Sequence, residues 1–182
     1  KNLEIELNKQ QILPILNTTE LHDDIKRLDV FLSNNSNIKN IEITLRQENS
    51  FEIAKELNKN FTNINFGLGS ILSEEDYLKG KDAGFHFFVS PGIVMSLVKN
   101  KVINYIPGGE TISEFMYLLD NGYKNIKFFP ANLAGGQKKL VSIENILKEA
   151  SFIPTGGINQ KNYMDFVSLK NVLCVGMSKF DN

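Results

Sequence analysis

The chain has 182 residues, of which 42% are hydrophobic and 23% are charged, and its formal net charge is −1. These values are typical of one globular domain, here residues 1–182, and such a charge argues against binding to nucleic acid or to an anionic membrane surface. No window reaches the roughly 18 apolar residues of a membrane span, and residues 1–11 lack the apolar segment of a signal peptide. The one cysteine, Cys174, cannot form an internal disulfide, so we expect a cytoplasmic protein.

Short apolar segments alternate with longer amphipathic segments along the whole chain. Each short segment is too short for a typical helix and apolar enough for a buried parallel strand. Eight strands are therefore expected: Ile12–Leu16, Ile41–Leu45, Ile64–Gly67, Phe85–Val89, Val102–Ile106, Asn125–Phe129, Phe152–Thr155 and Val172–Gly176.

Helical patterns lie between these strands. Thr18 and Thr19 can cap the first helix, an acidic first turn begins the third, and Gly122 follows the fourth. The four clearest helices are expected at Leu21–Ser33, Phe51–Asn60, Ser73–Gly84 and Ile112–Asn121.

Eight strands alternating with helices predict an α/β fold, a single (β/α)8 TIM barrel. An open, doubly wound sheet is the alternative, but it needs fewer strands or a glycine-rich dinucleotide loop after the first one. Asn17-Thr18-Thr19 stands there instead. Only Met177–Asn182 follow the eighth strand, so we expect the eighth helix to be missing or truncated.

Polar residues interrupt two of the expected strands. Side chains alternate along a strand, so Glu42 and Arg46 share the face of strand two that points into a barrel, with Thr44 between them. Lys127 and Phe129 share a face of strand six in the same way. A buried carboxylate and a buried lysine are costly unless they are paired or used, so a structural ion pair between Glu42 and Lys127 is one interpretation.

Carbonyl chemistry is the other interpretation. A desolvated lysine is a nucleophilic amine, an acid beside it can move protons, and an arginine at the strand end can hold a carboxylate with two hydrogen bonds. Glycines follow strands seven and eight, at Gly156, Gly157 and Gly176, and Ser178 adds a hydroxyl. Loops at these positions form the usual phosphate site of this barrel.

Five segments of the chain resemble, in order, the motifs of the 2-keto-3-deoxy-6-phosphogluconate (KDPG) aldolases. That family includes enzymes that also cleave 4-hydroxy-2-oxoglutarate (KHG). The resemblance extends from about Ile12 to Ser178. The segments are Glu42-Ile43-Thr44-Leu45-Arg46, Gly67-Leu68-Gly69-Ser70, Ser90-Pro91-Gly92, Lys127-Phe128-Phe129-Pro130-Ala131 and Pro154-Thr155-Gly156-Gly157-Ile158.

The resemblance implies a class I aldolase, a lyase that needs no metal or other cofactor and is usually a homotrimer. Its substrate is a small phosphorylated 2-keto acid. By position, Lys127 resembles the Schiff-base lysine and Glu42 the general acid/base that works through a water molecule. The other expected roles are carboxylate binding by Arg46 and Ser70, walls around the pyruvyl group from Pro91 and Phe129, a substrate hydroxyl contact from Thr155, and phosphate binding by Gly156, Gly157, Gly176 and Ser178.

Three departures from the family pattern leave alternatives open, and one of them is the expected lack of a complete eighth helix. Ser70 replaces the common Thr and keeps the hydroxyl, whereas Met177 replaces a common Gly and could narrow the phosphate site. A phosphogalactonate-type or KHG-preferring aldolase and a non-catalytic sugar-phosphate-binding relative therefore remain alternatives. No histidines, cysteines and carboxylates cluster at metal-ligand spacing. We expect His22 on an exposed helix face and His86 packed in strand four.

Overall fold

Residues 2–181 are described by a computed structural model, in which short parallel strands alternate with helices. The helices are α1 (Leu3–Gln10), α2 (Leu21–Asn34), α3 (Ser50–Asn60), α4 (Glu74–Asp82), α5 (Met95–Lys99), α6 (Ile112–Asp120), α7 (Gly136–Ile143) and α8 (Tyr163–Val167). The strands are β1 (Ile12–Asn17), β2 (Asn40–Thr44), β3 (Asn65–Gly69), β4 (Phe87–Val89), β5 (Tyr105–Ile106), β6 (Gly108–Gly109), β7 (Asn125–Phe128), β8 (Ser151–Pro154) and β9 (Val175–Met177).

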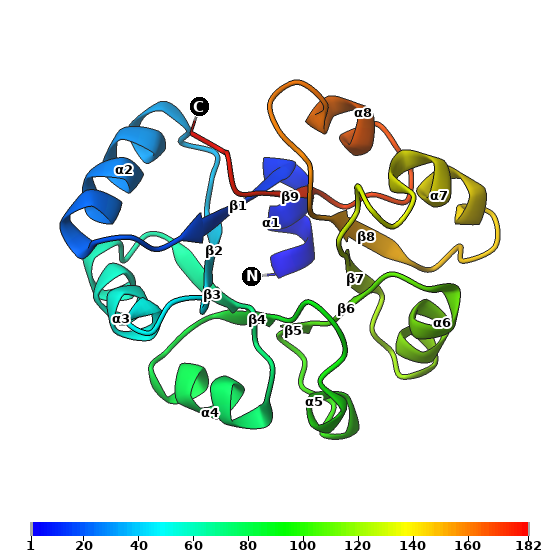
Figure 1. The fold of residues 1–182 in the computed structure, drawn as a ribbon, viewed down its shortest axis with the longest axis horizontal. Coiled ribbons are helices and arrows are strands. Elements are labelled where there is room, and N and C mark those ends of the chain that lie inside the picture. The colour runs from blue at the N-terminus through cyan, green and yellow to red at the C-terminus, as the bar shows by residue number, and fades with distance from the viewer. Residues whose placement is uncertain (1, 182) are drawn as a thin grey trace.

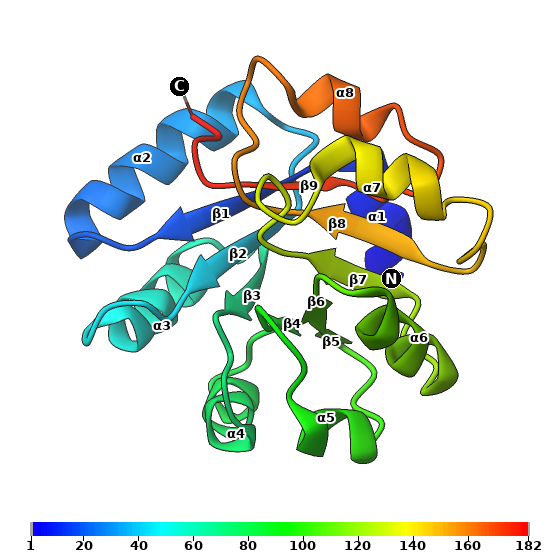
Figure 2. The same ribbon diagram turned by 45° about the vertical axis from the view of Figure 1, so that its right-hand side comes forward.

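The strands form two parallel sheets around a common centre. One sheet has the order β5-β4-β3-β2-β1-β9, and the other has the order β6-β7-β8. Helices α2 to α8 lie outside the strands, and α1 lies across the central opening (Figures 1 and 2). The predicted α/β class with parallel strands is therefore confirmed.

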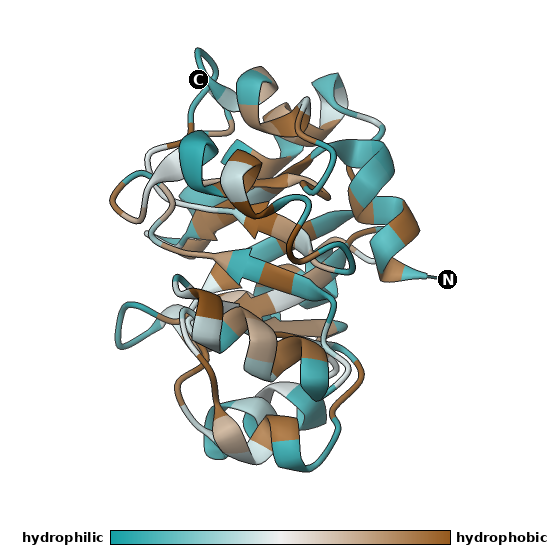
Figure 3. Ribbon diagram, turned by 90° about the vertical axis from the view of Figure 1, so that its right-hand side faces the viewer, coloured by the Kyte–Doolittle hydropathy of each residue, from teal (hydrophilic) through white to brown (hydrophobic). Residues whose placement is uncertain are grey.

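Most of the apolar side chains pack between the strands and the outer helices. Alternate residues of β2, Ile41 and Ile43, are fully buried there, as are Ile126 and Phe128 of β7. The helices at the periphery carry hydrophobic and hydrophilic residues in alternation, as an amphipathic covering layer requires (Figure 3). This packing fixes which face of each strand points outward, and hence which residues face the centre.

A smaller apolar cluster lies between the two sheets. Its members come from strands of both sheets, from the segment before β9 and from α1; they are Leu7, Leu13, Phe87, Val89, Ile106, Ile153, Leu173 and Cys174. Burial, together with the nearby Glu42 carboxylate, raises the pKa of the Cys174 thiol far above its usual range, so this thiol stays protonated and is not a nucleophile.

Helix α1 covers the end of the two sheets where the strands begin. Gln10 of this helix donates to the carbonyl oxygens of Ile12 and Asn40 at 2.8 and 2.9 Å. Glu6 accepts hydrogen bonds from the side-chain amides of Asn40 and Asn65. Helix α1 does not cover the opposite end, where the parallel strands finish, so a functional site can lie there.

Several local expectations differ from the structure. Neither predicted threonine caps α2: its N-cap is Glu20, while Thr18 bonds to the Ser50 hydroxyl and Thr19 donates to Asp24. Of the expected fifth strand, Val102–Ile106, only Tyr105–Ile106 is a strand, and the unpredicted β6 follows it after Pro107. Residues 178–181, which follow β9, contain no helix. No helix within residues 2–181 is both long and apolar enough to cross a lipid bilayer.

Candidate active site

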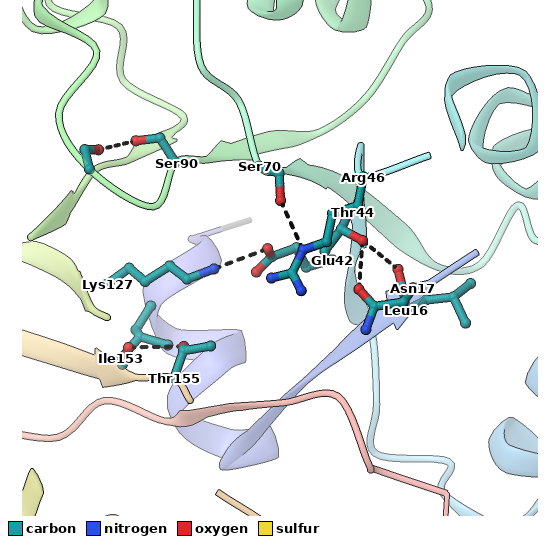
Figure 4. A network of polar contacts seen from close by, with 11 residues as sticks. Leu16, Asn17, Glu42, Thr44, Arg46, Ser70, Ser90, Lys127, Ile153 and Thr155 are labelled. Atoms are coloured by element: carbon teal, nitrogen blue, oxygen red, sulfur yellow. Dashed lines mark hydrogen bonds and ion pairs between the residues drawn. The ribbon is translucent and has the colours of Figure 1, made fainter. Parts of the chain in front are cut away.

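Lys127 and Glu42 meet between the two sheets. The Lys127 Nζ atom lies 3.3 Å from Glu42 Oε1, and only 4% and 1% of the two residues are exposed. The two side chains approach each other from β7 and β2, which belong to different sheets (Figure 4). Lys127 Nζ also lies 5.4 Å from the centre of the Phe129 ring, within range of a cation–π contact.

The alternation of side chains along the strands explains this meeting. Ile41 and Ile43 pack outward, so Glu42 and Thr44 must point inward, and both are 1% exposed. The predicted inward orientations of Glu42 and Lys127 are therefore confirmed. Gly69, at the end of the neighbouring strand β3, provides the space for the carboxylate: a Cβ atom there would lie 2.0 Å from Glu42 Oε1.

Arg46 and Ser70 form the rim of the site beside this pair. Arg46 follows β2 and is exposed, and its Nε donates to the Ser70 hydroxyl at 3.5 Å, a long hydrogen bond. Ser70 follows β3 with a φ of +59°, a left-handed conformation that is unfavourable for most residues other than glycine. Such strained residues concentrate at functional sites, where the surrounding structure holds them in place.

A cavity of about 160 Å³ opens at the ends of β1, β8 and β9. Seven of the predicted site residues line it, namely Arg46, Phe129, Thr155, Gly156, Gly157, Gly176 and Ser178. Lys127 and Glu42 are not among its lining residues. The structure thus places Arg46, which is predicted to bind the substrate carboxylate, at the same opening as the residues predicted to bind the phosphate.

Glycine is required at three positions of this cavity. Gly156 and Gly157 have φ angles of +107° and +72°, which side chains rarely adopt. A Cβ atom on Gly176 would lie 2.2 Å from the Thr155 hydroxyl oxygen, and residues 155 and 176 form an isolated parallel bridge. The hydroxyl of Thr155 is therefore held against the bare backbone of β9.

Three other residues lie elsewhere than the sequence suggested or outside the cavity. Met177 is 1% exposed and packs in the outer core, so its side chain does not narrow this opening. Pro91 follows β4 but does not line the cavity; its carbonyl oxygen lies against Gly108. His86 is exposed just before β4, rather than packed in it, whereas His22 is exposed on α2 as predicted. Sequence reasoning missed one polar cavity residue, Asn17 at the end of β1, and two apolar ones, Ile15 and Ile158.

The family model for KDPG and KHG aldolases matches residues 3–182 of this chain. The chain belongs to the KDPG and KHG aldolase family. It is 38% identical to the KHG/KDPG aldolase of Escherichia coli (strain K12) over 144 residues, which are 78% of this chain and 68% of that protein. Identity and coverage are the same for the 2-dehydro-3-deoxy-phosphogluconate aldolase of Dickeya dadantii (strain 3937).

Solved structures of KDPG aldolases share the fold. The KDPG aldolase of Legionella pneumophila, with pyruvate captured at low pH as a covalent carbinolamine intermediate, is 31% identical and superposes with a TM-score of 0.89, covering 97% of this chain and 86% of that one. The KDPG aldolase of Zymomonas mobilis ATCC 29191 is 27% identical, with a TM-score of 0.88 over 98% and 86% of the two chains. As a KDPG and KHG aldolase, this chain is an enzyme of the lyase class.

Proposed function

We propose that this aldolase cleaves KDPG to pyruvate and glyceraldehyde 3-phosphate, and KHG to pyruvate and glyoxylate, through a Schiff base on Lys127. The observation that carries the proposal is the Lys127–Glu42 pair, 3.3 Å apart and almost fully buried at the centre of the strands. A buried charge pair rarely adds net stability, because desolvating both groups offsets their attraction. A catalytic role explains why β2 and β7 carry a buried charge pair. The carbinolamine of the Legionella pneumophila relative, which an amine forms with a ketone, supports the same chemistry here.

The proposed reaction begins when Lys127 gives one proton to Glu42 and its amine attacks the C2 carbonyl carbon of the substrate; Glu42 returns that proton in the dehydration that follows. The resulting carbinolamine loses water and becomes an iminium ion, which is an electron sink. Glu42, through a water molecule, removes the proton of the C4 hydroxyl, and the C3–C4 bond breaks with its electron pair moving toward the iminium nitrogen. The aldehyde leaves, the enamine is protonated at C3, and hydrolysis releases pyruvate and the free amine.

The surrounding residues have proposed binding roles. Arg46 and Ser70 lie side by side at the rim and would bind the substrate carboxylate. Phe129, beside the lysine, and Pro91 would form walls around the pyruvyl group. Thr155 would contact a substrate hydroxyl.

The phosphate would bind at the far side of the cavity. Gly156, Gly157 and Gly176 line the cavity there without side chains, and Ser178 lines the same opening. Glycine-rich backbone suits an anion because N–H groups can approach it closely. The phosphate site and the lysine would then hold the two ends of one substrate.

We further propose that the two sheets act as one closed (β/α)8 barrel and a single domain. Two features support this: β5 and β6 are separated by one residue, Pro107, whose carbonyl accepts a hydrogen bond from Lys127 N, and parallel bridges join residues 152 to 172 and 155 to 176. We also propose the homotrimer that the family resemblance implies. Sedimentation equilibrium at several protein concentrations tests it, and a monomer at all of them would contradict it.

Borohydride trapping tests the proposed chemistry. Incubation with pyruvate and sodium borohydride should reduce the Schiff base to one stable adduct, and peptide mapping should place it on Lys127. Lys127→Met should give no adduct. Lys139→Met is a matched control, because Lys139 Nζ lies 5.6 Å from the Phe128 ring on the outer side of the same strand and should be dispensable. An adduct on another lysine, with Lys127 unlabelled, would contradict the proposal.

A further inference from the structure

Asn17 is a polar cavity residue without a role in the chemistry described above. It is the last residue of β1, is half-buried, and lines the cavity that also contains Gly156, Gly157 and Ser178. Arg46 and Phe129 line the same cavity, whereas Lys127 and Glu42 do not. Because four of the lining residues, Gly156, Gly157, Gly176 and Ser178, are the proposed phosphate site, we assign Asn17 to the phosphate-bearing half of the substrate. Asn17 is thus placed to contact the half of the substrate that leaves as the aldehyde.

The orientation of the Asn17 amide is fixed by a buried partner. Thr44, which is 1% exposed, donates its hydroxyl hydrogen to Asn17 Oδ1 at 2.7 Å (Figure 4). With Oδ1 held on that side, Nδ2 lies on the other side of the planar amide, and it carries two N–H donors. Among residues 2–181, the only side-chain hydrogen bond of Asn17 is the one from Thr44 to Oδ1, and Nδ2 donates none. A fixed donor without a protein partner is therefore presented at this opening.

We propose that Asn17 is a specificity-determining residue that donates a hydrogen bond to an oxygen of the phosphate-bearing half of the substrate. This inference rests on the proposed function, since it assigns one end of the same substrate. The chemistry favours a hydroxyl or phosphate oxygen, because the amide nitrogen can only donate. A site that presents a fixed donor discriminates strongly against a ligand that leaves the donor unpaired.

Two substitutions separate this role from a purely structural one. Asn17→Leu removes the donor and keeps a similar volume. Asn17→Asp keeps an oxygen that can accept from Thr44 but replaces the donor with an anionic oxygen. If Asn17 only supported Thr44, the aspartate variant would behave like wild type. If it donates to the substrate, the aspartate variant should be impaired at least as much as the leucine variant, because its charge repels the phosphate.

The synthesis direction distinguishes the two halves of the site, because pyruvate and the aldehyde are then separate substrates. For Asn17→Leu, we expect kcat/KM for glyceraldehyde 3-phosphate to fall about ten- to a hundredfold, the range for a hydrogen bond to a charged group. The KM for pyruvate and the borohydride adduct on Lys127 should not change. Glyoxylate, which has no phosphate, should lose less activity than glyceraldehyde 3-phosphate as the acceptor aldehyde.

Two outcomes would overturn the inference. One is a wild-type kcat/KM for Asn17→Asp, and the other is an equal loss for pyruvate and glyceraldehyde 3-phosphate in Asn17→Leu. Circular dichroism and thermal melting of both variants control for folding. Failure of the proposed function is distinguishable, because the wild-type protein would then form no pyruvate adduct on Lys127, whatever the Asn17 variants do.

Discussion

Gly69→Ala tests whether Glu42 must stay where the structure places it. The added Cβ atom would lie 2.0, 2.6 and 2.7 Å from Oε1, Cδ and Cγ of Glu42, so the whole end of that side chain must move. To restore an ordinary contact of 3.4 Å, Oε1 alone must shift by about 1.4 Å. That shift is large compared with the 3.3 Å separation of Oε1 from Lys127 Nζ.

A misplacement of about 1 Å in a catalytic group can reduce the rate by about 10²-fold, so we expect kcat to fall by at least that order. Overpacking of this kind typically lowers the free energy of unfolding by about 1–3 kcal/mol. Steady-state kinetics and urea denaturation measure the two effects separately, with kcat calculated per folded molecule.

Gly80→Ala is the matched control. Its Cβ atom would lie 2.6 Å from Leu68 Cδ1 and Phe88 Cε1, in the outer core and away from the site. We expect a comparable loss of stability with little change in kcat. A folded Gly69→Ala enzyme with wild-type kcat would refute the reasoning, because the carboxylate would then work equally well from another position.

Three other predictions concern single side chains. Glu42→Gln keeps the shape but removes the proton carrier, so kcat should fall about 10²–10⁴-fold with a smaller effect on pyruvate binding; a near-normal kcat would leave Glu42 only a structural role. Arg46→Ala removes a charged contact worth about 1.5–3 kcal/mol, and the loss should appear mainly in kcat/KM, with adduct formation partly retained at saturating pyruvate. The Arg27 guanidinium lowers the pKa of Asp181, so this pair should stabilise the fold above the usual carboxylate pKa and lose that effect as pH falls through the lowered value. Urea denaturation at several pH values should therefore show at most about 1 kcal/mol between wild type and Asp181→Asn above pH ~5, and a smaller difference below pH ~4; a constant difference would contradict the linkage.

The sequence alone indicated the alternation of parallel strands with helices and the inward face of the central strands. Side chains alternate along a strand with a period of two residues. Because Ile41 and Ile43 pack outward, the side chain of Glu42 must point inward. The same reasoning placed Lys127 opposite Ile126 and Phe128. Local patterns were less reliable at element ends, since Thr19 resembled a helix cap but bonds to Asp24. The first helix, α1, is rich in polar residues and was not predicted.

Only the tertiary structure decided which polar groups meet and how closely. Lys127 and Glu42 are 85 positions apart in the chain, and their 3.3 Å separation depends on how the two sheets face each other. The space at Gly69 and the bond that orients Asn17 are likewise contacts between different strands. Local sequence patterns encode the period of a strand and the polarity of its faces, whereas distances across the centre depend on the packing of all the strands together.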